Sequence, residues 1–100
     1  MSELCLNLLC PLAIEEKLLD LLLMSSDVEI FTSAPIAAHG LVDGALSQTE
    51  QVLGRRQATQ IQVMLSGAGK EALLETIRQQ FVGVGLRYWI TPLVESGRLE

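Results

Sequence analysis

The fold is decided by residues 59–81, which read TQIQVMLSGAGKEALLETIRQQF. In the first part apolar side chains alternate with polar ones, which is the period of a strand with one buried face. Gly67-Ala68-Gly69 then turns the chain. After this turn the apolar residues recur three to four positions apart, the spacing of one helix face. The stretch therefore predicts a strand over 59–66 and a helix over 70–81.

The rest of the chain repeats this alternation of strand and helix. The further predicted elements are a strand over 4–10, a helix over 13–24, and strands over 28–32 and 86–91. The order strand, helix, strand, strand, helix, strand is that of the α+β ferredoxin-like β-α-β-β-α-β fold. Right-handed crossovers place both helices on one face of a four-stranded sheet.

The second face of the predicted sheet has no helix to cover it. Its predicted residues are Cys5, Asn7, Leu9, Glu29, Phe31, Gln60, Gln62, Met64, Arg87, Trp89 and Thr91. This mixture is too apolar for a solvated surface and too polar for a monomer core. A large exposed patch that contains Trp, Phe and Met usually marks a partner surface. We therefore expect a closed homo-oligomer whose subunits pack their sheets together.

The composition fits a single domain over residues 1–100 and excludes several function classes. The formal net charge of −5 disfavours nucleic-acid binding, which needs a basic surface, and it equally disfavours docking on an anionic membrane. The apolar run over 18–24 is too short and, with Asp20, too charged for membrane insertion. Two cysteines without an evident signal peptide indicate reduced thiols and a cytoplasmic protein.

A long connection over 33–57 separates the second and third predicted strands, and no strand or helix pattern runs through it. Ser47 and Glu50 fit a capping box within it, and Gly54 stands where a C-cap would, which predicts one or two helical turns. Connections of this length in a compact domain are commonly either functional or disordered. This connection is therefore the candidate place for function.

Several short strings along nearly the whole chain carry a family resemblance. They are Phe31-Thr32-Ser33 with Pro35, His39-Gly40, Leu46-Ser47 with Glu50-Gln51-Val52, Gly54-Arg55-Arg56, and Tyr88-Trp89-Ile90-Thr91-Pro92-Leu93. With the predicted topology and the long connection, the sequence resembles the PII-like superfamily of trimeric signalling proteins. Within that superfamily it is similar to the uncharacterised proteobacterial domain-of-unknown-function family 3240.

The resemblance implies a homotrimer whose sheets face a central axis. It also implies that the 33–57 connection is the counterpart of the PII T-loop, a mobile loop that responds to a small ligand or a partner protein. Members of this family tend to be encoded beside heavy-metal efflux systems. The resemblance therefore implies a role in heavy-metal stress, with a metal-efflux component as the candidate partner. The segment 82–85 carries no Lys or Arg ahead of Arg87, which disfavours adenine-nucleotide binding in the PII manner.

Four charged residues are the candidates for binding a ligand or a partner. They are Arg55, Arg56, Glu50 and Arg87. Adjacent guanidinium groups suit bidentate contacts with a phosphate or a carboxylate. The alternative is a solvated arginine pair that is balanced by Glu50 or by an acidic neighbouring subunit.

His39 and Cys5 are the candidates for binding a heavy-metal ion. His39 is the only histidine of the chain, and it is either an exposed residue of the connection or a metal ligand or pH-sensitive contact. Cys5 and Cys10 are five positions apart on one strand, so they face opposite ways and cannot bridge each other. Buried packing is the other interpretation of each thiol, and a metal site would need thiols from neighbouring subunits. No nucleophile is paired with a base, so we do not expect an enzyme.

Overall fold

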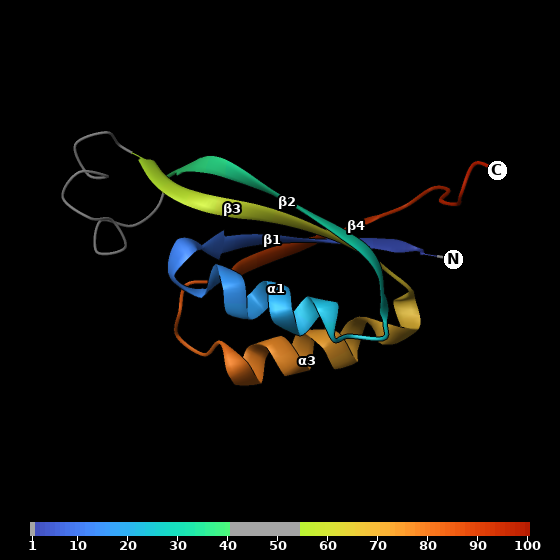
Figure 1. Cartoon of the computed structure of the whole chain (residues 1–100), viewed down its shortest axis with the longest axis horizontal. Helices are drawn as coiled ribbons and strands as arrows, with labels where there is room; N and C mark the ends of the chain where they lie inside the picture. The colour runs from blue at the N-terminus through green and yellow to red at the C-terminus, as the bar shows by residue number, and fades with distance from the viewer. Residues whose placement is uncertain (1, 41–54) are drawn as a thin grey trace.

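The computed structural model describes residues 2–40 and 55–100, which form two layers, a four-stranded sheet and a pair of helices (Figure 1). The elements in these ranges are β1 (Leu4–Pro11), α1 (Glu15–Leu23), β2 (Val28–His39), β3 (Arg55–Leu65), α3 (Lys70–Gln80) and β4 (Arg87–Pro92), with 3-10 turns at Leu12–Ile14 and Gly67–Gly69. The strands pair antiparallel in the order β2-β3-β1-β4. Both helices cover the same face of the sheet (Figure 1), so the predicted ferredoxin-like α+β fold is confirmed.

The core lies between the helices and one face of the sheet. Leu6 and Leu8 of β1 and Ile61 of β3 point toward the helices, and Leu18 and Leu22 of α1 pack against them. Burial of each such aliphatic side chain contributes about 1.5–3 kcal/mol, so packing on the sheet stabilises these short helices more than their propensity does. No helix in the described ranges is long and apolar enough to cross a membrane.

Strands β2 and β3 extend farther than the sequence predicts. β2 continues to His39 and β3 begins at Arg55, so both ends of the expected 33–57 connection belong to the sheet. β2 is an edge strand, and an edge strand tolerates Pro35, which lacks a backbone N–H donor. The prediction that the second strand ends at Thr32 is therefore wrong. The helical turns expected between Ser47 and Gly54 lie outside the described residues.

A bulge at the start of β2 reverses the alternation that the sequence predicts there. Val28 pairs with Leu65 and Ile30 pairs with Met64. Two residues of β2 are therefore matched by a shift of only one residue in β3. Phe31 consequently packs against the core, whereas Ile30 faces away from the helices and is 57% exposed. The prediction that Phe31 lies on the helix-free face is wrong.

Candidate functional site

The sheet face turned away from the helices, which we call the outer face, is built by all four strands. Its residues are Cys5, Asn7, Leu9, Ile30, Thr32, Gln60, Gln62, Met64, Arg87, Trp89 and Thr91. No described element covers this face (Figure 1). Apart from Ile30 and Thr32, which replace the expected Glu29 and Phe31, this is the face that the sequence predicts. Trp89 is 46% exposed on it, so a single subunit leaves large apolar side chains in water.

Asn7 lies near the middle of the outer face and is only 4% exposed. Its Nδ2 donates to the carbonyl oxygens of Cys5 and Trp89 at 3.3 and 3.4 Å. Gln62 Nε2 donates in turn to Asn7 Oδ1 at 3.4 Å. Both ends of the amide therefore have partners inside the subunit, so covering this part of the face leaves no amide group of Asn7 without a hydrogen bond.

Arg56 and Arg87, two of the candidate ligand-binding residues, meet at one end of the outer face. They line a shallow hollow of about 10 Å³ together with Leu9, Pro11, Ala38, Ala58 and Gly85. Neither arginine forms a salt bridge within residues 2–40 and 55–100. A hollow of this size holds about one water molecule, so an anion would lie over it. Two such guanidinium groups suit a phosphate or a carboxylate.

The other two candidates for this site are less fully described. Arg55 begins β3 and stands opposite His39 in the β2–β3 register. Its side chain, and the whole of Glu50, lie outside the described residues. His39 is exposed, and it ends β2 and does not lie in the connection where the sequence places it. The roles of Arg55 and Glu50 stay predictions.

The two thiols have different surroundings. Cys5 is buried on the outer face beside Met64, its partner in the register. Cys10 points into the core, where burial raises the pKa of its thiol to about 11, with the Glu15 carboxylate adding to the shift. Such a thiol stays protonated near neutral pH, so it is not poised to bind a metal or to act as a nucleophile.

The proposed metal ligands lie far apart within one subunit. His39 pairs with Arg55, and Cys5 pairs with Met64, which is nine positions farther along β3. At about 3.3 Å per residue this is roughly 30 Å of strand. No group of three potential metal-ligating side chains gathers in the part of the chain that the structure describes. A site that uses both His39 and Cys5 therefore needs more than one subunit.

A helix-covered antiparallel sheet with a free outer face and a long β2–β3 ladder defines a ferredoxin-like α+β domain. The chain belongs to the family described as Protein of unknown function (DUF3240), whose family model matches residues 1–100. No curated protein matches the sequence.

Solved structures of the same fold include another member of this family. A DUF3240 family protein from Shewanella baltica is 22% identical with a TM-score of 0.82, over 100% of this chain and 99% of that chain. A putative PII-like signaling protein from Thermus thermophilus is 8% identical with a TM-score of 0.66, over 93% of this chain and 88% of that one. The periplasmic divalent cation tolerance protein CutA from Archaeoglobus fulgidus is 10% identical with a TM-score of 0.70, over 98% of this chain and 89% of that one. At these identities the likeness concerns the fold.

The outer face also shows what the sequence missed. Strict alternation through Glu29 predicts Ile30 on the core side, and a bulge of one residue leaves no clear mark in the sequence. The closeness of Arg56 and Arg87 was not predicted either, because it depends on β3 and β4 both flanking β1. The inferred strand order of a ferredoxin-like sheet, combined with the register, could have indicated it.

Proposed function

We propose that this protein is a homotrimeric PII-like regulatory protein of the cytoplasm that takes part in the response to heavy metals and has no enzymatic activity. The observation that carries the proposal is the outer face, which leaves Trp89 and Ile30 partly exposed around a hydrogen-bonded Asn7. A face of this kind fits a contact between copies of the chain.

Assembly through the outer face is favoured by its energetics. Covering Trp89, Ile30 and Met64 would remove apolar surface from water at about 25 cal/mol per Å². The amide of Asn7 would not oppose this, because its hydrogen bonds are already made within the subunit. A closed ring of three sheets would leave no unpaired copy of the face.

The signal would be received near Arg56 and Arg87, with Arg55 and Glu50 completing the site. On a chain of net charge −5 these arginines concentrate positive charge locally. Such a site favours a small anionic ligand or an acidic segment of a partner protein. The ligand would change the conformation of the β2–β3 connection only if it binds one arrangement better than another.

The proposed link to heavy metals is supported by the fold likeness to CutA, whose description names divalent cation tolerance. The proposed partner is a component of a metal-efflux system. Direct metal binding through His39 and intersubunit Cys5 thiols is the alternative function. The position of Cys5 on the outer face supports this alternative, because in the proposed trimer the outer faces meet.

Native mass spectrometry of the wild-type chain and of the Trp89→Lys variant tests the assembly. We expect a trimer for the wild type and a monomer for the variant, because an unpaired ammonium group buried in an interface costs several kcal/mol. Val94→Lys is the matched control, since Val94 is fully exposed beyond β4, and it should stay trimeric. Circular dichroism verifies that each variant is folded. A monomeric wild type, or a trimeric Trp89→Lys, refutes assembly through this face.

The same measurement, made on protein purified without chelator and mixed with zinc, copper or ADP, distinguishes the two functions. A regulatory protein that works through protein contacts should bind no stoichiometric metal. One metal ion per subunit that is lost in the His39→Ala variant supports direct metal binding instead. Stoichiometric ADP would contradict the expectation drawn from the segment ahead of Arg87.

A further inference from the structure

Helix α1 carries more apolar residues than the core uses. Of its five leucines, Leu18 and Leu22 are buried, and Leu19 and Leu21 are partly buried against the core. Leu23 is 71% exposed, and Met24, which follows it, is 87% exposed. A helix that is apolar around most of its circumference is normally covered on more than one side. The exposed Leu23 and Met24 therefore indicate a second contact surface on the helix face of the molecule.

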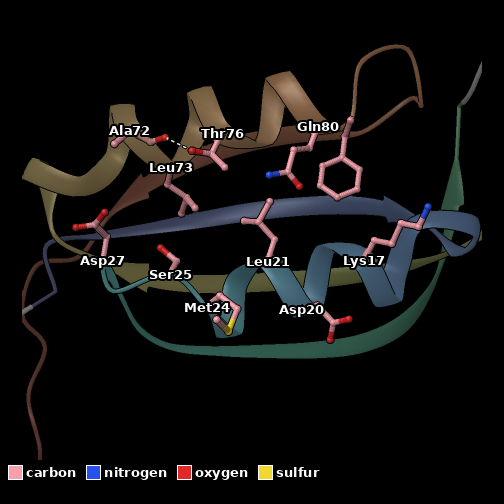
Figure 2. Close-up of a pocket in the computed structure, with 11 residues that line it drawn as sticks. Lys17, Asp20, Leu21, Met24, Ser25, Asp27, Ala72, Leu73, Thr76 and Gln80 are labelled. Atoms are coloured by element: carbon pink, nitrogen blue, oxygen red, sulfur yellow. Dashed lines mark hydrogen bonds between the residues drawn. The ribbon is translucent and has the colours of Figure 1, made fainter.

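A groove of about 810 Å³ lies between α1 and α3 on this face and opens to solvent (Figure 2). Figure 2 shows Leu21 of α1 and Leu73 of α3 pointing toward the space between the two helices. Phe81, directly after α3, and Met24, directly after α1, also line the groove. The volume lies in the range of ordinary binding sites, and apolar side chains line the groove together with the polar Ser25, Thr76 and Gln80.

Two carboxylates lie at different places along the groove, Asp20 on α1 and Asp27 against Gly69 of the β3–α3 turn. Neither carboxylate forms a salt bridge within residues 2–40 and 55–100. Lys17 is the one cation among the lining residues, near the start of α1. An occupant with cationic side chains toward Asp20 and Asp27 would therefore be complementary in charge.

We propose that this groove binds one basic amphipathic helix of a partner protein. Both walls are helices whose backbone groups are bonded internally, so an extended segment would find no strand edge with which to pair. A helix can insert its side-chain ridges between those of α1 and α3. Its apolar stripe would contact the exposed Met24 and the partly buried Leu21 above the buried Leu73, and its lysines or arginines would face Asp20 and Asp27. Methionine suits such a contact because its flexible side chain adapts to its partner.

The groove and the outer face lie on opposite sides of the sheet, so both can be occupied at once (Figure 1). The inference goes beyond the proposed function, because it places a partner on the helices and does not depend on trimer formation. The helices α1 and α3 are nine and eleven residues long. At 1.5 Å per residue they offer roughly 14–17 Å, which is two to three turns of a bound helix.

A pair of synthetic 14-residue helical peptides tests the proposal on the full-length chain. Both carry leucines at i, i+4, i+7 and i+11; one has lysines on its other positions, and the second has glutamates in their place. Fluorescence anisotropy of the labelled peptides gives the affinities, and amide chemical shifts of ¹⁵N-labelled protein locate the contact. We expect the lysine peptide to bind at least about tenfold more tightly than the glutamate peptide. The shifted amides should belong to α1 and α3 and not to β4.

Variants at exposed positions complete the test without disturbing the core. Met24→Ser should weaken binding of the lysine peptide by about tenfold, since it removes an exposed apolar contact without adding charge. The control Val94→Ser makes the same kind of change at a fully exposed residue outside the groove, and it should bind like the wild type. Replacing Asp20 and Asp27 by Asn should weaken binding about fivefold and reduce its salt dependence.

Three results would overturn the proposal. The first is the absence of shifts in α1 and α3 with either peptide, and the second is equal affinity for the two peptides. The third is self-association of the wild type that Met24→Ser abolishes, since a second copy of the chain would then occupy the groove. Trp89→Lys separates this inference from the proposed function, because it should abolish the trimer and leave peptide binding intact.

Discussion

The turn between β3 and α3 passes so close to Asp27 that residue 69 has no room for a side chain. A Cβ atom placed on Gly69 would lie 2.6 Å from both Cβ and Cγ of Asp27 and 2.8 Å from Oδ1. Rotation of the Asp27 side chain cannot remove the contact with its own Cβ, so the backbone itself must move. Overpacking of this kind costs about 1–3 kcal/mol. The smaller entropy of the unfolded chain with alanine offsets about 0.4–1 kcal/mol of this.

We therefore expect Gly69→Ala to lower the free energy of unfolding by about 1–2 kcal/mol, and the melting temperature by about 4–8 °C for each kcal/mol. Calorimetry or thermal circular dichroism at one fixed protein concentration measures this change, because association would shift the transition. Gly67→Ala is the matched control in the same turn. Its added Cβ would lie 3.5 Å from Glu3 Oε1, an ordinary contact, so its stability should be unchanged or slightly raised.

A double-mutant cycle identifies the cause of the loss. Asp27→Gly removes the Cβ that Gly69→Ala would meet, so the second substitution should cost little in that background. The two changes should then show a coupling free energy of about 1–2 kcal/mol. Two results would contradict this cause: Gly69→Ala is as stable as Gly67→Ala, or Gly69→Ala lowers the free energy of unfolding equally with and without Asp27. Either would show that the close approach of Asp27 is not the reason why position 69 needs glycine.

Two further predictions concern the core. Because burial raises the pKa of Cys10 from 9.0 to about 11, its thiolate is about 100-fold rarer at pH 8 than that of an unperturbed thiol, and iodoacetamide should modify it correspondingly slowly. The thiol of the unfolded chain loses its proton at lower pH than that of the folded chain, so the free energy of unfolding should fall as pH rises from about 9 to 11. Peptide mapping measures the labelling, and urea unfolding measures the stability. Rapid labelling of Cys10 in the folded protein would contradict the prediction. Leu18→Ala should lower the free energy of unfolding, measured in urea, by about 3–5 kcal/mol. Leu23→Ala, on the same helix but at a residue that is 71% exposed, should change it by no more than about 0.5 kcal/mol. Equal losses for the two variants would show that α1 packs differently.

The sequence predicts the layers of this fold well because its patterns are local. Alternation through Ile61, Val63 and Leu65 and the helical spacing from Leu73 to Phe81 both follow from which side chains must be buried. The errors occur where tertiary context overrides a local signal. Pro35 indicates the end of a strand, yet β2 continues past it to His39 because it is an edge strand.

The candidate site was harder to predict than the fold. Arg56 and Arg87 are singled out by their charge, but 31 positions separate them, and only the pairing of β3 and β4 with β1 brings them to one hollow. The groove between α1 and α3 leaves a weaker signal. The run of leucines around α1 indicates more apolar surface than one core needs, but it does not say where the second contact lies.

The register places Arg56 in a part of the sheet that only β2 and β3 form. Pairing between β1 and β3 ends at Pro11 and Ala58, whereas β2 and β3 remain paired as far as His39 and Arg55. Beyond Ala58 the sheet is therefore a two-stranded ribbon, which is marginally stable without other contacts. Arg56 belongs to this ribbon, while Arg87 belongs to the body of the sheet. An anion held by both would tie the ribbon to the body, and a ligand at this one point could thereby bias the segment that joins the two strands.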